Sequence, residues 1–392
     1  MTVSGSCEPK TDAPIRLALV STELGVGGAE KCATMLAQGI RQYGFQPEVV
    51  SLAAPPSPGH SRFIRELESA GIPVHFIGVD QPSQFLRGVS RLTRLLRQMQ
   101  PHILQSFLFH ANIVSAWAAR RARVPYTFAG LRVAEPEKWR WRLLRLAASQ
   151  VQQFVCVSQS VADFAVSSGL PAGKLAVIPN AVDVEQIQDL PPTNLQTLGI
   201  ASGRRAILCV ARFERQKGVE WLLEQAHSIL EQLPEFDLVL AGSGTQFESA
   251  RQFVNSQDWH QRVHLLGQRD DVPELMKACD LVVLPSRWEG MPNVLLEAMA
   301  CRRPVVAHQV QGVVELLGPL AIEQSVKPDQ PVDFVKKVVA LSTNMAKSAS
   351  LGDANSQRVA KHFTVQQLCA AYARQYLTHD QCHPNLPGKK YK

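Results

Sequence analysis

Two glutamates, Glu289 and Glu297, lie eight residues apart in one short stretch of the sequence. They follow the apolar run Leu281–Leu284, whose β-branched residues are typical of a buried parallel strand. A turn at Gly290 and Pro292 comes next, and a helical pattern follows it. We therefore expect Glu289 in the loop before the helix and Glu297 in the second turn of the helix.

This arrangement suits a phosphate-bearing ligand. Free N–H groups and the positive end of the helix dipole at a helix start favour a phosphate. Eight residues at a rise of 1.5 Å separate the two acids by roughly 12 Å along the axis. A nucleoside diphosphate sugar fits between them, with Glu289 at the sugar and Glu297 at the ribose. The spacing also fits a plain strand–loop–helix unit that carries two solvated acids.

Two cations, Arg212 and Lys217, follow the expected strand 206–210. Cations just past a strand can hold a diphosphate leaving group by charge-assisted hydrogen bonds. A solvated turn is the other interpretation of the same two residues.

A glycine-rich turn, with Gly27 and Gly28, follows the first apolar strand, Ile15–Ser21. Glycines between a strand and a helix let the backbone approach a phosphate closely. The turn is not a dinucleotide fingerprint, because Glu30 stands where that pattern needs a small residue. The glycines could equally serve close packing of strand and helix.

Strand and helix patterns alternate along the chain in two series, which predicts an α/β protein with two doubly wound, Rossmann-like domains. Strands are expected at 15–21, 47–52, 73–76, 103–107, 126–129, 154–158 and 175–178, and then at 206–210, 237–241, 263–266, 281–284 and 304–307. We predict domains at 1–188 and 189–362, a helix at 363–378 that crosses back to the first domain, and a disordered tail at 379–392.

Polar and glycine residues gather after these strands, where parallel sheets bind ligands. They are Gly27, Gly28, His110, Arg132, Arg212, Lys217, Gly242, Gly244, Gly267 and Glu289. Their distribution over both series suggests one cleft between two domains. For His110, a hydrogen-bonded core histidine is the alternative.

Length, charge and cysteines exclude several classes of protein. The chain has 392 residues, a net charge of +7 and eight cysteines, none in a C-x-x-C pair, which fits a reducing cytosol and no zinc site. Residues 1–14 lack the apolar core of a signal peptide. The segment His102–Ala119 is the nearest approach to a membrane span, but its polar side chains favour a strand and a buried helix.

Basic residues concentrate between Arg87 and Arg145, where twelve Arg or Lys face only Glu135 and Glu137. Trp139 and Trp141 lie in this region, and tryptophan beside cations suits a lipid headgroup layer. We therefore expect salt-sensitive binding to an anionic membrane surface. Nucleic acid could use the same charge, but no matching motif accompanies it, so no nucleic-acid partner is expected. A solvated basic face without a partner is the remaining alternative.

The motifs together resemble the retaining GT-B glycosyltransferases of family four, over roughly residues 15 to 376. The resemblance rests on Glu289-x7-Glu297, Arg212 with Lys217-Gly218, Gly242-Ser-Gly244 and Ile178-Pro-Asn180-Ala-Val-Asp183. In the N-terminal half it rests on Gly27-Gly28-Ala-Glu30 and His110-x-Asn112.

This resemblance implies a metal-independent enzyme without a cofactor that uses a nucleotide sugar, commonly a uridine diphosphate sugar. It implies that Arg212 and Lys217 bind the diphosphate, that Glu297 binds the ribose and that Glu289 binds the sugar, with His110 near the reacting centre. The base is placed beside Gly267 and Gln268. The implied catalytic residues are Glu289, His110, Arg212 and Lys217, and the other implied substrate contacts are Gly27, Gly28, Arg132, Gly242, Gly267, Gln268, Gly290, Met291, Asn293, Val294 and Glu297.

The chain departs from the family pattern at three positions. Family members often carry an aliphatic or aromatic residue and a glycine where Met291 and Pro292 stand, and Pro292 offers no N–H to a ligand. His308 stands where smaller polar residues are common.

The expected function is glycosyl transfer with retained anomeric configuration, to a saccharide or lipid-linked saccharide acceptor, in the synthesis of cell-surface polysaccharide or glycolipid. The expected location is the cytoplasm, peripheral at the inner face of the membrane. The family's front-face route, in which the leaving phosphate takes the acceptor proton, needs no protein base. The alternatives are a GT-B nucleotide-sugar epimerase and a non-catalytic protein that binds nucleotide or glycan.

Overall fold

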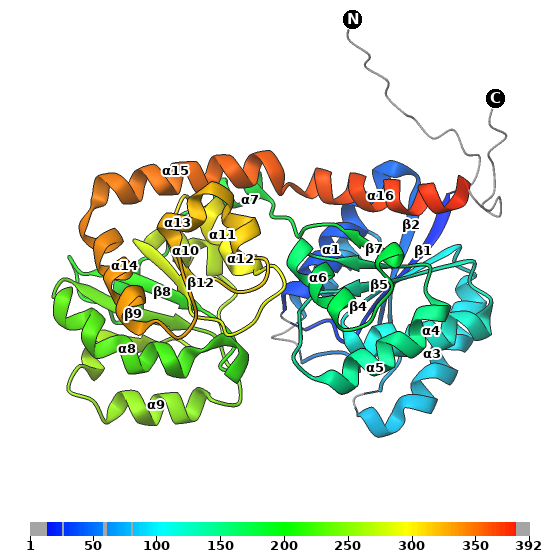
Figure 1. Cartoon of the computed structure of the whole chain (residues 1–392), viewed down its shortest axis with the longest axis horizontal. Coiled ribbons are helices and arrows are strands. Elements are labelled where there is room, and N and C mark those ends of the chain that lie inside the picture. The colour runs from blue at the N-terminus through cyan, green and yellow to red at the C-terminus, as the bar shows by residue number, and fades with distance from the viewer. Residues whose placement is uncertain (1–13, 26, 58–60, 80, 382–392) are drawn as a thin grey trace, which may run out of the picture. The chain divides into compact units, whose positions relative to one another are not determined.

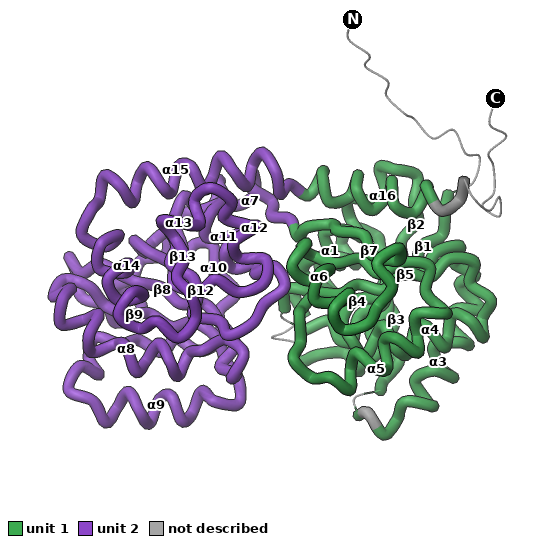
Figure 2. Tube along the Cα trace, viewed as in Figure 1, with its two compact units in different colours: residues 1–180, 365–392 green, residues 181–364 purple. Residues whose placement is uncertain are grey.

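The computed structural model describes residues 14–25, 27–57, 61–79 and 81–381, and it divides the chain into two compact units (Figure 2). Unit 1 comprises Met1–Asn180 and Val365–Lys392, and unit 2 comprises Ala181–Thr364. The final helix, α16 (Val365–Gln381), is thus part of unit 1. This helix includes residues 379–381 of the expected tail, and residues 382–392 lie outside the described residues.

The boundary between the units differs from the one expected at residue 188. Helix α7 (Val184–Asp189) packs against α11 (Asn293–Ala300), and both helices belong to unit 2. Lys277 Nζ donates hydrogen bonds to the carbonyls of Gln188 and Leu190, at 2.7 and 2.6 Å. The chain on both sides of Asp189 is therefore held to the rest of unit 2 by these hydrogen bonds.

Unit 1 is a seven-stranded parallel sheet in the order β3-β2-β1-β4-β5-β6-β7 (Figure 1). Its strands are β1 (Ile15–Ser21), β2 (Phe45–Ser51), β3 (Val74–Phe76), β4 (Ile103–Phe107), β5 (Tyr126–Leu131), β6 (Gln153–Cys156) and β7 (Leu175–Val177). Its α-helices besides α16 are α1 (Gly28–Gly39), α2 (Arg62–Ser69), α3 (Phe85–Met99), α4 (Phe109–Ala122), α5 (Lys138–Ala147) and α6 (Gln159–Ser167).

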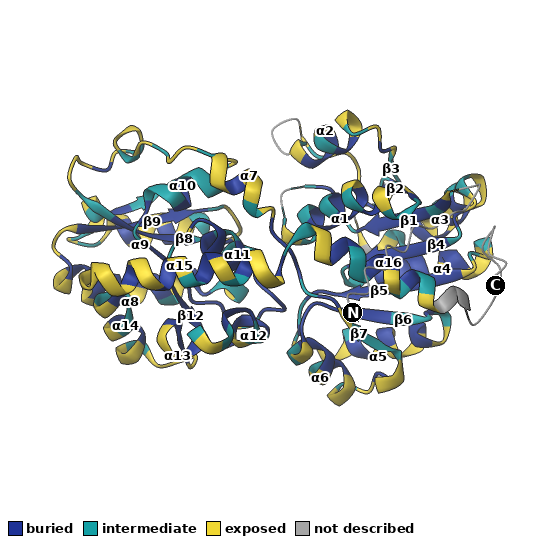
Figure 3. Ribbon diagram, turned by 90° about the horizontal axis from the view of Figure 1, so that it is seen from above, coloured by how far each residue is buried: buried dark blue, intermediate teal, exposed yellow. Residues whose placement is uncertain are grey.

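Alternate residues of the central strands bury opposite faces of this sheet. Ala18 and Val20 of β1 join a core with Leu92 of α3 and Val114 of α4. On α16, the Tyr376 ring lies 5.0 Å from that of Phe128. Figure 3 shows the consequence, with strands almost wholly buried and helices exposed on their outer sides.

Unit 2 is a six-stranded parallel sheet in the order β10-β9-β8-β11-β12-β13. Its strands are β8 (Arg205–Val210), β9 (Phe236–Ala241), β10 (Val263–Leu265), β11 (Leu281–Leu284), β12 (Val305–His308) and β13 (Ser325–Val326). Its other α-helices are α8 (Val219–Gln232), α9 (Phe247–Asn255), α10 (Val272–Ala278), α12 (Val313–Leu317), α13 (Ala321–Gln324), α14 (Pro331–Thr343) and α15 (Met345–His362).

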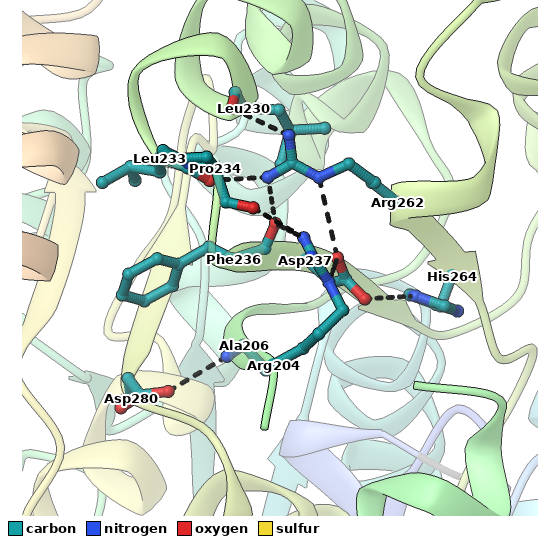
Figure 4. Close-up of polar contacts among 10 residues, drawn as sticks. All are labelled: Arg204, Ala206, Leu230, Leu233, Pro234, Phe236, Asp237, Arg262, His264 and Asp280. Atoms are coloured by element: carbon teal, nitrogen blue, oxygen red, sulfur yellow. Dashed lines mark hydrogen bonds and ion pairs between the residues drawn. The ribbon is translucent and has the colours of Figure 1, made fainter. Parts of the chain in front are cut away.

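A cluster around Asp237 fixes the amino end of the unit 2 sheet (Figure 4). Its carboxylate, almost fully buried, accepts from Arg204 Nε at 2.5 Å and lies 3.0 Å from His264 Nε2. Arg262 donates to the carbonyls of Leu230 and Leu233 and so caps the last turn of α8. These charges lie at the amino ends of the strands, opposite to the carboxyl ends.

In the described part of the chain, no helix is long and apolar enough to span a bilayer. The segment 102–119, weighed above as a span, consists of β4 and most of α4. The side chains of Gln105, Ser106 and Asn112 in this segment are hydrogen-bonded inside unit 1. Ser106 Oγ, for example, donates to Asn112 Oδ1 at 2.8 Å.

Candidate functional site

The unit 2 sheet has a topological switch point between β8 and β11, and crevices at such points bind ligands. The loop after β8 carries Lys217, and the loop after β11 carries Glu289. Lys217 Nζ lies 2.5 Å from Glu289 Oε1. The structure thus brings together two residues that lie 72 positions apart in the chain and that were both predicted to bind the ligand.

The Glu289 side chain is buried but half of its carboxylate is uncommitted. The residue is only 4 % exposed, and Ser286 Oγ donates to Oε1 at 2.7 Å. Both this bond and the Lys217 contact fall on Oε1, and Oε2 makes no hydrogen bond with any described residue. The fixed carboxylate can therefore accept a hydrogen bond from a ligand hydroxyl at Oε2.

Backbone contacts hold the Glu289 loop on both sides. Arg287 N–H donates to the Gln216 carbonyl at 2.8 Å, and Gln216 Nε2 donates to the Trp288 carbonyl at 3.0 Å. On the other side, a Cβ at Gly312 (φ +73°) would lie 1.8 Å from the Gly290 carbonyl oxygen, so only glycine fits there. These supports, Ser286 included, could not be assigned from the sequence, because they position the carboxylate without any motif chemistry of their own.

The second predicted cation and the second predicted acid lie at the same edge of unit 2. Arg212 is exposed, and its side chain makes no hydrogen bond or ion pair within the described residues. Glu297 is half-buried in the second turn of α11. Pro292 is the N-cap of α11 rather than part of its first turn, so the helix begins at Asn293.

The other predicted contacts near Glu289 surround the start of α11. Gly290 and Met291 are buried, whereas Asn293 and Val294, the first two helical residues, are half-buried. The first N–H groups of this helix therefore belong to Asn293 and later residues, since Pro292 has none.

Close backbone packing explains the glycine after β9, Gly242, whereas a positive φ of +67° explains Gly267 after β10. Gly242 N–H donates to the Gly267 carbonyl at 2.7 Å, and a Cβ at Gly242 (φ +143°) would lie 1.9 Å from the Ala211 carbonyl oxygen. Gln268 is exposed beside them, where Ser243 Oγ donates to its Oε1 at 3.3 Å. A flat ligand such as a nucleobase could reach the backbone at this corner.

In unit 1 the side chain of Glu30 lies against the glycine turn that follows β1. A Cβ at Gly27 would lie 2.2 Å from Glu30 Oε2, and Glu30 is buried in the first turn of α1. Glycine at position 27 thus leaves room for the Glu30 carboxylate. A buried carboxylate here also disfavours a phosphate at the start of α1, beside Gly28.

His110 is exposed at the start of α4, so it is not a core histidine. The preceding Leu108 has φ +71° and ψ 160°, a conformation nearly restricted to glycine, and such strain is typical of functional sites. The Phe109 ring lies 5.2 Å from the His110 ring. Partial burial, and then the positive charge of Arg140, lower the pKa of His110, which favours a neutral imidazole.

The two polar residues of the His110-x-Asn112 motif have different environments. Asn112 is buried, accepts from Ser106 Oγ and donates to the Gly130 carbonyl at 2.8 Å, which ties the ends of β4 and β5 together. A pocket beside it is lined by residues that include Phe109 and Trp141. Asn112 therefore positions the start of α4, while His110 is accessible to a ligand.

Arg132 is buried, with 8 % exposure, at the end of β5. Its Nη2 donates to Asn180 Oδ1 at 2.5 Å, and Asn180 is the last residue of unit 1 before the chain enters unit 2. The structure thus places this predicted substrate contact in an internal hydrogen bond at the domain boundary, away from solvent.

Comparisons with known proteins agree with these features. A family model described as group 1 glycosyl transferases matches residues 204–344, and one described as Glycosyltransferase Family 4 matches residues 26–186. An N,N'-diacetylbacillosaminyl-diphospho-undecaprenol α-1,3-N-acetylgalactosaminyltransferase of Campylobacter jejuni is 28 % identical over 69 % of this chain and 77 % of its own. A UDP-Gal:α-D-GlcNAc-diphosphoundecaprenol α-1,3-galactosyltransferase of Escherichia coli is 27 % identical over 58 % of this chain and 62 % of its own.

Solved structures show the same fold. Anabaena HepE in complex with UDP and glucose superimposes with a TM-score of 0.81 and 21 % identity, over 93 % of this chain and all of the other. Staphylococcus aureus TarM superimposes with a TM-score of 0.75 and 10 % identity, over 92 % of this chain and 98 % of the other. The chain has the GT-B fold, and it belongs to the family-four glycosyltransferases and is a glycosyltransferase.

Proposed function

We propose that this enzyme transfers a sugar from a uridine diphosphate sugar, with retained anomeric configuration, to a lipid-linked saccharide. The observation that supports a donor site in unit 2 is the Lys217–Glu289 pair at the switch point of its sheet. The activities that the names of the Campylobacter and Escherichia relatives state, both on undecaprenol-linked acceptors, support the choice of acceptor. The UDP bound in Anabaena HepE supports the choice of base.

The charges of unit 2 suit departure of a diphosphate. An ammonium has three N–H donors, so Lys217 can keep its bond to Glu289 and still donate to a phosphate oxygen. Arg212, exposed and without a side-chain partner among the described residues, adds a planar guanidinium that can donate two hydrogen bonds. As the bond from the anomeric carbon to the phosphate breaks, negative charge grows on the leaving group, and these fixed cations stabilise it. No metal or other cofactor is part of this proposal.

In the proposed reaction the acceptor oxygen bonds to the anomeric carbon on the face that the diphosphate leaves. The acceptor proton passes to the departing phosphate, so no protein base is required. Glu289 Oε2 accepts from a hydroxyl of the sugar, and Glu297 accepts from the ribose. His110, neutral and exposed, serves the acceptor side of the reaction in unit 1.

An epimerase would release a changed free sugar, and a non-catalytic protein would bind the nucleotide without turnover. Incubation with UDP-, GDP- and ADP-sugars in EDTA, with and without a polyprenyl diphosphate saccharide, separates these outcomes. The proposal expects transfer, and slow hydrolysis without acceptor, with a UDP-sugar. Release of an epimer, or binding without turnover, would contradict it.

We further propose that the enzyme docks on an anionic membrane through the outer face of α5. Trp139, Leu143 and Leu146 are spaced by four and three residues, so they form one stripe, and they are 51, 38 and 67 % exposed. The exposed cations Lys138 and Arg142 flank this stripe. Apolar and basic stripes side by side on a solvent-facing helix suit the headgroup layer of an anionic bilayer.

The structure corrects part of the charge argument made from the sequence. Trp141 is buried, and its indole N–H donates to the Glu135 carbonyl, so it cannot enter a headgroup layer. Arg132 is buried, and Arg140 pairs with Glu135. The α5 face also lies close to His110, which is proposed to serve the acceptor side. The Trp139 ring lies 5.3 Å from that of Phe109, the neighbour of His110.

Co-sedimentation with vesicles of phosphatidylglycerol or phosphatidylcholine across a salt series tests this docking. The double variant Leu143→Ser and Leu146→Ser should lose binding to the anionic vesicles. The double variant Ile322→Ser and Val332→Ser, which removes exposed apolar side chains from unit 2, is the matched control and should bind normally. Equal recovery of the wild type in the soluble fraction under all conditions would defeat the docking proposal.

A further inference from the structure

His308, the last residue of β12, is only 3 % exposed, and its ring lies between two aromatic side chains. The ring centroids of Trp221 and Phe334 are 4.6 and 5.5 Å away. Burial lowers the pKa of His308, and the ring is therefore neutral in the folded protein at pH 7.

The hydrogen bond between this ring and the Ser286 carbonyl identifies the protonated nitrogen. Nδ1 lies 3.3 Å from the carbonyl oxygen of Ser286, and a carbonyl oxygen can only accept. Nδ1 therefore carries the proton, and Nε2 is an acceptor that has no partner among the described residues. Burying an unsatisfied nitrogen costs free energy that an aliphatic side chain would not cost. The hydrogen bond that Nδ1–H donates to the Ser286 carbonyl is the interaction that can offset this cost.

Ser286 connects this bond to the donor site. Its carbonyl accepts from His308, while its own hydroxyl donates to Glu289 Oε1 at 2.7 Å. A shift of Ser286 would move the hydroxyl that donates to the carboxylate, so the position of Ser286 bears on the position of Glu289. We propose that His308 is a positioning residue that fixes the Ser286 peptide and thereby aims Glu289 at the donor sugar.

The Ser286–Arg287 peptide is held at both of its polar groups, because its N–H donates to the Gln216 carbonyl at 2.8 Å and its carbonyl accepts from His308. Gln216 holds the backbone at Arg287 and Trp288, and Lys217 holds the end of the Glu289 side chain. Within the described residues, the side chain that donates to the Ser286 carbonyl is that of His308. Loss of this donor should thus disturb the sugar end of the site and leave the nucleotide end unchanged. The inference rests on the proposed contact between Glu289 and the sugar.

The test compares His308→Leu, which removes the donor, with His308→Asn, whose amide N–H₂ can take the place of Nδ1–H. Measured with the preferred nucleotide sugar, His308→Leu should lower kcat by about tenfold or more, the scale for a small misplacement of reacting groups. Calorimetry should show unchanged affinity for the free nucleotide. His308→Asn should restore most of kcat.

His264→Leu is the matched control, because His264 is a histidine of the same sheet that contacts Asp237 at the opposite end. This variant should lower the melting temperature without changing kcat. If His308→Leu does not fold, Ser286→Ala tests the same connection from its other end and should lower kcat likewise.

Three results bear on the inference. Equal kcat in His308→Leu and the wild type would overturn it. A loss of kcat that His308→Asn does not restore would also overturn it, because shape rather than the donor would then matter. A wild type that does not turn over any nucleotide sugar would instead contradict the proposed function, so the two failures are distinguishable.

Discussion

Lys217 Nζ lies 2.5 Å from Glu289 Oε1, with the two side chains 17 and 6 % exposed, and this ion pair joins the loops that follow β8 and β11. Pairing is required, since an isolated charge at such a position would lose its hydration without compensation. The same two residues are proposed to contact the donor, so loss of the pair should affect both the stability of unit 2 and the transfer reaction.

Removing one partner of the pair should therefore destabilise unit 2 more than removing both charges. We expect Lys217→Met to lower the free energy of unfolding by up to about 3 kcal/mol, the scale for leaving a buried charge unpaired. The double variant Lys217→Met and Glu289→Gln should recover part of this loss. Urea unfolding of the wild type, both single variants and the double variant measures the coupling, and strictly additive losses would show that the contact contributes little.

Glu297→Ala should weaken nucleotide binding, because Glu297 is proposed to accept hydrogen bonds from the ribose. Hydrogen bonds to a charged group contribute about 1.5–3 kcal/mol, so affinity should fall by roughly 10- to 150-fold. Calorimetric titration with UDP measures this effect, with the exposed Glu220 of α8, changed to Ala, as the control. Unchanged affinity in a folded Glu297→Ala protein would remove this residue from the site.

Arg212→Ala should lower kcat as well as affinity, because its stabilisation of the diphosphate grows as the leaving group gains charge. Little change in melting temperature is expected, since Arg212 is exposed and has no partner among the described residues. Steady-state kinetics give the division between kcat and KM. A variant whose single defect is a raised KM would show that Arg212 binds the ground state and the transition state equally.

His110→Ala should cut turnover with little loss of stability, because the side chain is exposed. The lowered pKa of His110 also predicts a pH dependence. The neutral ring persists below pH 6.5, the ordinary pKa, and kcat/KM should fall only as the pH drops through the lowered value. His110→Gln should remove this acidic limb, and a profile that keeps the limb in the variant would assign it to another group.

Much of the fold could be predicted from local patterns. The apolar runs at Ile15–Ser21, Ile103–Phe107 and Leu281–Leu284 are strands with the expected bounds, because buried parallel strands leave a continuous apolar signature. The region 318–362 gave no prediction, although it contains β13 and the long helices α14 and α15. Strand β13 has only two residues, too few for any periodicity.

The residues proposed to bind the donor directly could be predicted from the sequence. The residues that hold them in position could not. Motif spacing indicated Glu289 and Lys217, and the structure pairs them. Ser286, Gln216 and His308 were not assigned to the site, because hydrogen bonds between backbone and side chain across distant loops leave no periodic signal. Trp141 was misplaced for a related reason, since composition alone does not tell which face of α5 is buried.

The most direct test of the proposed activity is the anomeric outcome of a single transfer. The wild-type enzyme, with a UDP-α-sugar and a polyprenyl diphosphate saccharide in EDTA, is followed by proton NMR of the anomeric signals. We expect a new glycosidic bond with the α configuration of the donor, and no such product from a folded Lys217→Met protein. A β-linked product, or no transfer with any nucleotide sugar by a folded wild type, would contradict it.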